Sequence, residues 1–137
     1  MIDKLYHLKQ VQIEQELMQK QELIHKIDDI NKQVSQYRDQ LENVTVESSG
    51  AMVDFEILAI HKKTMKQYII DLGRQSMLLS QKVDQHNNAI VQLQKESEQY
   101  EYLLNEEKKE QYKEELKIEA LIADEITQSK WAKKHVV

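Results

Sequence analysis

The chain has 137 residues with no Pro, no Cys and only two Gly, and 31% of its residues are charged. Its net charge is −5, its pI is near 5.6 and its mean hydropathy is −0.71. This composition argues against a large globular core and against a disulfide framework, and an acidic surface makes nucleic acid and anionic lipid poor partners. So few turn-forming residues favour one all-α domain of long helices.

No apolar run approaches the roughly 18–20 residues that a membrane-spanning helix needs. Residues 1–10 also lack the pattern of a signal peptide. A chain without Cys suits a reducing compartment. We therefore expect a cytoplasmic protein without direct membrane insertion.

The first helix is predicted over about residues 2–44. From Leu23 onward, apolar residues recur at alternating spacings of three and four, which places them on one stripe of a helix. The stripe contains Leu23, Ile27, Ile30, Val34, Tyr37, Leu41 and Val44. The apolar pattern is interrupted at Lys20, so the sequence defines the register of residues 2–20 less well.

A turn is predicted over residues 45–52. The whole chain, residues 1–137, is predicted to form a single domain. Gly50 can adopt a positive φ after the first helix, and Ser48, Ser49 or Asp54 can cap the second. The connection is short, so it predicts two helices that fold back on each other.

The second helix is predicted over about residues 53–128 and carries a heptad repeat. One line of the repeat holds Leu58, Met65, Leu72, Leu79, His86, Leu93 and Tyr100. The other holds Phe55, Lys62, Ile69, Ser76, Val83, Ile90, Ser97 and Leu104. Together with the stripe of the first helix, these two lines predict an antiparallel two-helix coiled-coil hairpin.

Facing residues of such a hairpin should have numbers that sum to about 99, because both helices leave the turn with the same rise per residue. This register pairs Leu58 with Leu41, Met65 with Val34, Ile69 with Ile30, Leu72 with Ile27, His86 with Ile13, and Leu93 with Leu5 or Tyr6. His86 then forms a polar layer that fixes register, although a pH switch is an alternative interpretation.

The first helix is too short to cover the second beyond about Gln99, which leaves roughly 30 residues, or about 45 Å, as an overhang. After a charged stretch from Asn105 to Lys117, the overhang holds an apolar cluster of Leu116, Ile118, Leu121, Ile122, Ile126 and Trp131. An isolated helix is stabilised chiefly by burying such a face. Binding of another protein is the favoured interpretation, and self-association is the alternative.

Catalysis is not expected, since the sequence has no Gly-rich phosphate loop, nucleophile elbow or Cys/His pair. Glu22 and His25 have the Glu-x-x-His spacing of di-iron bundles, but such sites need a second pair and further carboxylates. No second pair occurs at the other histidines. The sequence therefore predicts no metal site, no cofactor and no enzyme activity.

The C-terminal half resembles the FliJ-type flagellar export proteins, the stalk family of type III export ATPases. The residues that carry the resemblance are Gln81–Asp84, Tyr100–Leu104, Glu106–Lys109, Tyr112, Glu115, Lys117, Glu119, Asp124–Ile126 and Trp131. Residue-level similarity covers about the last 55 positions. The chain departs from many members of the family in being acidic and in having several polar seam positions.

The resemblance implies a stalk that inserts into the ring of a hexameric export ATPase and promotes its assembly and activity. It also implies contacts with the export-gate membrane protein and export chaperones, hence a cytoplasmic protein peripherally associated with the membrane export apparatus and monomeric alone. By motif, the ring-facing residues would be Tyr100, Leu103, Leu104, Tyr112, Leu116, Ile118, Leu121, Ile122 and Trp131.

A second hypothesis places contact with the export gate at His61, Met65 and Tyr68, near the seam of the second helix. Core packing is the stronger interpretation for Met65, and binding is the stronger one for Tyr68. Two other functions stay open from the pattern alone: a prefoldin-like holding chaperone, and a structural coiled-coil dimer. The short turn leaves little room for the β-hairpins of prefoldin subunits.

Overall fold

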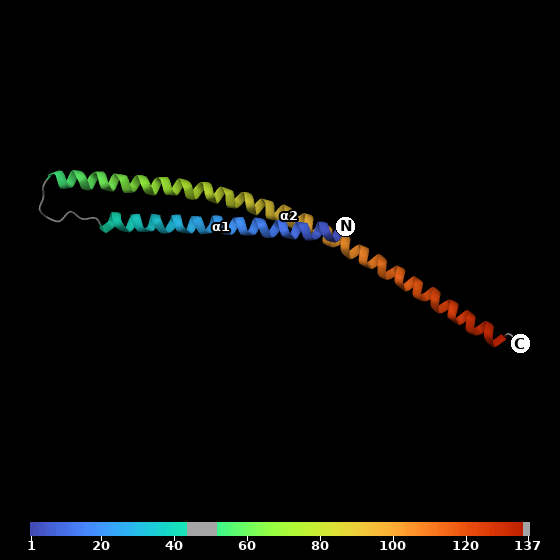
Figure 1. Ribbon diagram of the computed structural model, residues 1–137. Helices are drawn as coiled ribbons and strands as arrows, with labels where there is room; N and C mark the ends of the chain where they lie inside the picture. Colours follow the sequence, from blue (N-terminus) through green and yellow to red (C-terminus); the bar gives the residue numbers. More distant parts are fainter. Residues whose placement is uncertain (44–51, 136–137) are drawn as a thin grey trace. The chain divides into compact units, whose positions relative to one another are not determined.

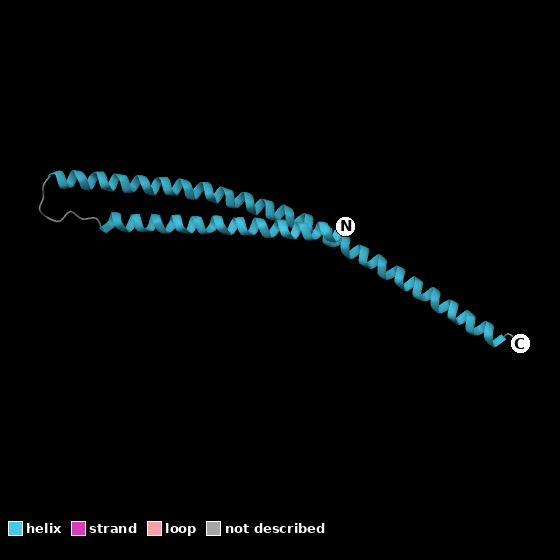
Figure 2. Cartoon of the chain, viewed as in Figure 1, coloured by secondary structure: helices cyan, strands magenta, loops and turns pink. Residues whose placement is uncertain are grey.

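A computed structural model describes residues 1–43 and 52–135, with the side chains of residues 52, 53 and 135 left out. It contains two helices, α1 (Ile2–Asn43) and α2 (Met52–His135), drawn in Figures 1 and 2. The predicted all-α hairpin class is confirmed. α2 ends at His135 rather than near residue 128. Residues 44–51, which include Val44 of the predicted stripe and Ser48, Ser49 and Gly50 of the predicted turn, lie outside the described residues, and Met52, predicted as the last residue of the turn, begins α2.

Both helices follow from the absence of helix breakers and from favourable first turns. Neither contains Pro, and their first turns carry the acidic residues Asp3 and Asp54. Negative charge near a helix N-terminus interacts favourably with the unpaired backbone N–H groups there. Helices of 42 and 84 residues are far longer than the average of about 11–12. Such lengths need side-chain packing along a seam for their stability.

One compact unit comprises residues Gln12–Leu93, in which α1 and α2 run side by side in opposite directions (Figure 1). Two contacts define the direction. The rings of Tyr37 and Tyr68 pack with centroids 5.8 Å apart and an interplanar angle of 41°. Nearer the other end, Nδ1 of His86 contacts a carboxylate oxygen of Glu16. As the numbers fall along α1, they rise along α2.

The seam of this unit uses the two predicted stripes. Along α2, every position from Leu58 to Leu93 on the two heptad lines is buried or half-buried. Along α1, the same holds from Ile13 to Leu41, through Lys20, at alternating spacings of three and four. Met65, at 2% exposed, is the most fully buried large side chain, and Ile13 and Ile90 are also buried. Most other seam residues are half-buried, because two helices cannot enclose a side chain on all sides.

The predicted register is wrong, although the stripes are right. Tyr37 pairs with Tyr68 and Glu16 with His86, so the paired numbers add to 105 and 102 rather than about 99. Glu16, and not Ile13, therefore faces His86. Stripe positions repeat every 3.5 residues on average, so sliding one helix by a layer buries the same set of side chains. The heptad alone does not distinguish these registers.

Phe55 is a second correction. The heptad placed it on the seam, but it is 55% exposed. With paired numbers of 102–105, Asn43 at the end of α1 lies level with about residues 59–62 of α2. The first turns of α2 therefore extend past the end of α1, and Phe55 has no α1 residue opposite it.

The other compact unit comprises Met1–Val11 and the described part of Gln94–Val137. Ile2, Tyr6 and Lys9 of α1 and Ser97, Tyr100 and Leu104 of α2 are its covered stripe positions. Met1 and Asp3 share a surface hollow with Leu104. The seam therefore reaches Leu104 rather than stopping near Gln99, because its register is shifted relative to the predicted one.

Gly73 provides a test of helix propensity free of packing effects. It lies inside α2, and a Cβ built there meets nothing within 4 Å. Gly73→Ala should therefore raise the free energy of unfolding by up to about 1 kcal/mol, since Gly is the poorer helix former by that amount. Urea unfolding followed by circular dichroism measures the change. The exposed neighbour change Gln75→Ala should alter stability far less, and a destabilised Gly73→Ala chain would show that the glycine has a packing role.

Candidate partner-binding face

The C-terminal part of α2 has no side chain that is even half-buried. From Glu107 to Lys134, every residue of this helix is exposed. We call this stretch the C-terminal segment. At 1.5 Å per residue, it is roughly 40 Å long. Helices in proteins are stabilised mainly by the packing of an apolar face against another element.

Exposed apolar residues gather in this segment. Leu116, Ile118, Leu121, Ile122, Ile126 and Trp131 are between 46% and 64% exposed. Ile118, Ile122 and Ile126 are spaced by four, so they lie along one face of the helix. Leu121 adjoins this line. We call Ile118, Leu121, Ile122 and Ile126 the isoleucine face. Ile126 was not among the predicted ring-facing residues. Its spacing of four from Ile122 could have identified it as a member of this face.

The stretch that precedes the isoleucine face is charged and helical. Its acidic and basic residues alternate closely, and Lys109 Nζ lies 3.5 Å from a carboxylate oxygen of Glu106. A single exposed pair of this kind stabilises a helix by only about 0.2–0.5 kcal/mol. Like charges at i,i+4, such as Glu110 and Glu114, oppose it by similar amounts. The charges keep this stretch solvated and contribute little net stability.

Two polar contacts join α1 to α2 in the unit that contains the C-terminal segment. Lys9 Nζ lies 2.7 Å from a carboxylate oxygen of Glu96, and this hydrogen bond raises the pKa of Lys9 above its ordinary value. One residue along, Gln10 Nε2 donates to the buried Ser97 Oγ at 2.6 Å. Both contacts need one particular register, because a slide by one layer separates both partners.

A third polar contact lies within the unit Gln12–Leu93. His86 Nδ1 and Glu16 meet on the seam, and both side chains are half-buried. The predicted polar layer at His86 is therefore present, with a carboxylate as its partner. Gln12, also half-buried, has a buried Oε1 atom with no hydrogen-bond partner. This part of the seam is consequently polar, and it gains less from apolar burial than the layer at Met65.

The predicted ring-facing residues divide into two groups. Tyr112, Leu116, Ile118, Leu121, Ile122 and Trp131 are exposed in the C-terminal segment, and Leu103 is also exposed. Tyr100 and Leu104 are half-buried on the seam, which limits what they can offer to another protein. The longer reach of the seam is the physical reason for this correction.

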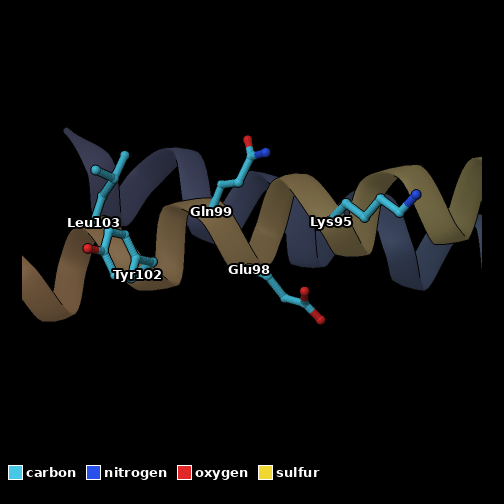
Figure 3. A pocket seen from close by; sticks show the side chains of 5 residues that line it. All are labelled: Lys95, Glu98, Gln99, Tyr102 and Leu103. Carbon is cyan, nitrogen blue, oxygen red and sulfur yellow. The ribbon is translucent and has the colours of Figure 1, made fainter.

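Leu103 belongs to a shallow hollow that sequence reasoning missed. Lys95, Glu98, Gln99, Tyr102 and Leu103 line it, all from α2 (Figure 3). Tyr102 and Leu103 supply its exposed apolar surface. No feature of the heptad singles out Tyr102, because it lies on neither seam line. The hollow is open and rests on one helix, so it suits a side chain of another protein better than an enclosed small molecule.

Of the three residues predicted to contact the export gate, only two are exposed. His61 and Tyr68 are exposed, but Met65 is buried in the seam and cannot take part in a docking surface. Tyr68 is 49% exposed, and one side of its ring packs on Tyr37. Met65 lies on a heptad line that α1 covers, whereas His61 and Tyr68 lie beside that line. The predicted gate contact is therefore reduced to His61 and Tyr68.

Other site classes find little support in the described part of the chain. Among residues 1–43 and 52–135 there is no group of three or more His, Asp or Glu side chains placed to hold a metal ion. Across the same residues, neither helix has a stretch apolar enough to cross a bilayer. The exposed apolar side chains of α2 are consequently the features that most need an explanation.

The fold defines a class of protein, the all-α helical hairpin with a polar-layered coiled-coil seam. Comparison of the chain with protein families, with characterised proteins and with solved structures finds no match.

Proposed function

We propose that the chain is a non-catalytic stalk or adaptor of a flagellar type III protein export apparatus. In this role its C-terminal segment inserts into the ring of a hexameric export ATPase, promotes ring assembly and activity, and links the ring to the export gate and export chaperones. The flagellar assignment rests on the sequence resemblance. The chain would work from the cytoplasm, in peripheral association with the membrane export apparatus.

One observation supports the proposal most: the isoleucine face is exposed on a helix segment without any covered residue from Glu107 to Lys134. Leaving four large apolar residues on one face in water is unfavourable by roughly 1–2 kcal/mol each relative to burial. A pore lined by other helices or loops can cover such a face on all sides. The half-buried seam that ends at Leu104 provides a natural limit to insertion.

The proposal is tested with the cognate hexameric ATPase. The intact chain is expected to raise its rate of ATP hydrolysis. A chain that ends after Asn105 keeps the seam residues Tyr100 and Leu104, so it should fold as a hairpin and yet give no stimulation. Absence of stimulation by the intact chain would count decisively against the proposal.

A full-length variant separates the isoleucine face from the rest of the segment. Ile118→Gln/Ile122→Gln/Ile126→Gln should weaken binding to the ATPase at least tenfold, since clustered apolar anchors dominate such interfaces. Lys113→Gln is the matched control, because nine residues place it on the opposite side of the helix from Ile122. Equal binding by both variants would remove the isoleucine face from the proposal.

A further inference from the structure

Opposite charges lie at the two ends of the isoleucine face. Residues spaced by four form one row along the surface of a helix, and Ile118, Ile122 and Ile126 belong to such a row. The row continues with acidic residues toward the seam and with basic residues toward the end of α2. In chain order it contains Glu110, Glu114, Ile118, Ile122, Ile126, Lys130 and Lys134, all of them exposed. We call these seven residues the charge-flanked row.

The charge-flanked row complements a second copy of itself that runs in the opposite direction. Symmetric pairs of identical chains present the same surface to each other. With a two-fold axis at Ile122, Glu114 faces Lys130 of the second copy, and Glu110 faces its Lys134. Between these opposite charges, Ile118 faces Ile126 and Ile122 faces its own counterpart. Every member of the row therefore meets a residue of matching chemistry.

Other arrangements of the same two rows lose this match. A parallel pair places Glu114 against Glu114 and Lys130 against Lys130, and such like charges repel. An antiparallel pair shifted by one member of the row places either Lys130 against Ile118 or Glu114 against Ile126. Only the antiparallel register centred on Ile122 joins apolar members to apolar members and each charge to its opposite.

The packing of such rows has a common geometry in helical proteins. Rows of residues spaced by four lie along each other when two helices cross at about −50°. In this crossing, Ile118 of the second copy reaches the surface next to Ile126. A shallow hollow is present there, lined by Glu125, Ile126, Ser129, Lys130 and Lys133. Two such hollows, one on each copy, can each receive an isoleucine.

We propose that a second copy of the chain covers the isoleucine face through this antiparallel crossing. The charges at the two ends of the charge-flanked row select the second copy and set its direction, and the isoleucines supply the apolar contact. The pairing rests on the proposed function in one respect, since a second copy and the export ATPase would then compete for the same face. Such a dimer departs from the monomer that the resemblance implies.

Sedimentation equilibrium of the full chain, from about 1 to 200 µM, measures the pairing without any ATPase. The apolar centre is only about two helical turns long, so a reversible dimer with a Kd of roughly 10–100 µM is expected. Glu114→Lys and Lys130→Glu should each raise that Kd at least tenfold, because attraction becomes repulsion at both ends of the pair. Lys113→Glu is the matched control. It changes the net charge as Lys130→Glu does, but it lies on the opposite side of the helix from Ile122 and should change the Kd less than about threefold.

An exchange of charges tests the antiparallel register. Glu114→Lys/Lys130→Glu restores both attractive contacts in reverse, so its Kd should return to within about threefold of the native value. A mixture of the Glu114→Lys chain and the Lys130→Glu chain should form a mixed dimer, although neither chain pairs well with itself. A chain that stays monomeric up to 200 µM overturns the proposal. A dimer whose Kd is unaffected by Glu114→Lys does the same, since it is joined in parallel or through another surface.

Competition is measured by fluorescence energy transfer between two labelled pools of the chain. Addition of the hexameric ATPase should lower the transfer, because the ring takes up the face that joins the two copies. Unchanged transfer in the presence of an ATPase that binds the chain overturns the competition. An ATPase that does not bind the chain removes the proposed function and leaves the pairing of two copies standing, so the two proposals fail separately.

Discussion

Met65→Ala is expected to lower the free energy of unfolding by about 2–5 kcal/mol, the usual range for truncating a buried Met. Met65 is 2% exposed, which makes it the best-enclosed large side chain of the described seam. Most other seam residues are only half-buried, so truncating Met65 removes the most complete apolar burial of the described seam. A loss of this size is a large fraction of the roughly 5–15 kcal/mol that stabilises a typical domain. Urea unfolding followed by far-ultraviolet circular dichroism measures it.

Met18→Ala is the matched control for this change. Met18 is 67% exposed on α1, so its truncation should alter stability by less than about 0.5 kcal/mol. Both substitutions replace Met with Ala inside a helix, and their helix propensities therefore change equally. Similar midpoints for the two variants would mean that α1 does not cover Met65, and the arrangement of the hairpin would have to be revised.

Gln10→Leu is expected to cost about 1–2 kcal/mol of stability, because it removes the amide that donates to Ser97. Ser97 is buried at 5% exposed, so water does not readily replace the lost partner. The double change Gln10→Leu/Ser97→Ala should bring stability back to that of the native chain or above it. Replacing both members of a buried polar pair by apolar groups removes the desolvation penalty together with the hydrogen bond.

Thermal unfolding of the two single variants and the double variant forms a double-mutant cycle for this layer. Ser97→Ala alone should change stability little, since the half-buried Gln10 amide can turn toward solvent. If the double variant is no more stable than Gln10→Leu, the two side chains do not interact as a pair. Cross-links between α1 and α2 in the double variant would then show whether its register also becomes mixed.

Much of the fold could be predicted from the sequence. The two lines that start at Leu58 and Lys62 are the seam lines of α2, and the stripe from Leu23 to Leu41 is the seam of α1. Helix and stripe were both predictable because they depend on local properties: the lack of Pro, the scarcity of Gly, and apolar residues at the helical period. The exposure of Ile118, Leu121 and Ile122 also followed, since these residues lie well beyond any residue of α1 in the hairpin pattern.

The candidate sites were less predictable wherever they depended on the reach of α1. Tyr100 and Leu104 were expected to be free for an ATPase ring and are half-buried, whereas Phe55 was expected on the seam and is exposed. All three differences have the same cause, a shift of α1 along α2 by about one layer. Exposed apolar residues of α2 that lie away from the seam, such as Ile60 and Met77, were not predicted, because the heptad pattern identifies only the seam lines.

The sequence by itself determined the class of fold, the identity of the seam lines and the apolar character of the C-terminal segment. Only the tertiary structure decided which residues of α1 face which residues of α2. A heptad repeat looks the same after a slide of one layer, so apolar burial is nearly equal in neighbouring registers. Contacts between residues far apart in the chain, such as Tyr37 with Tyr68 and Glu16 with His86, distinguish the registers, and they exist only once the two helices have met.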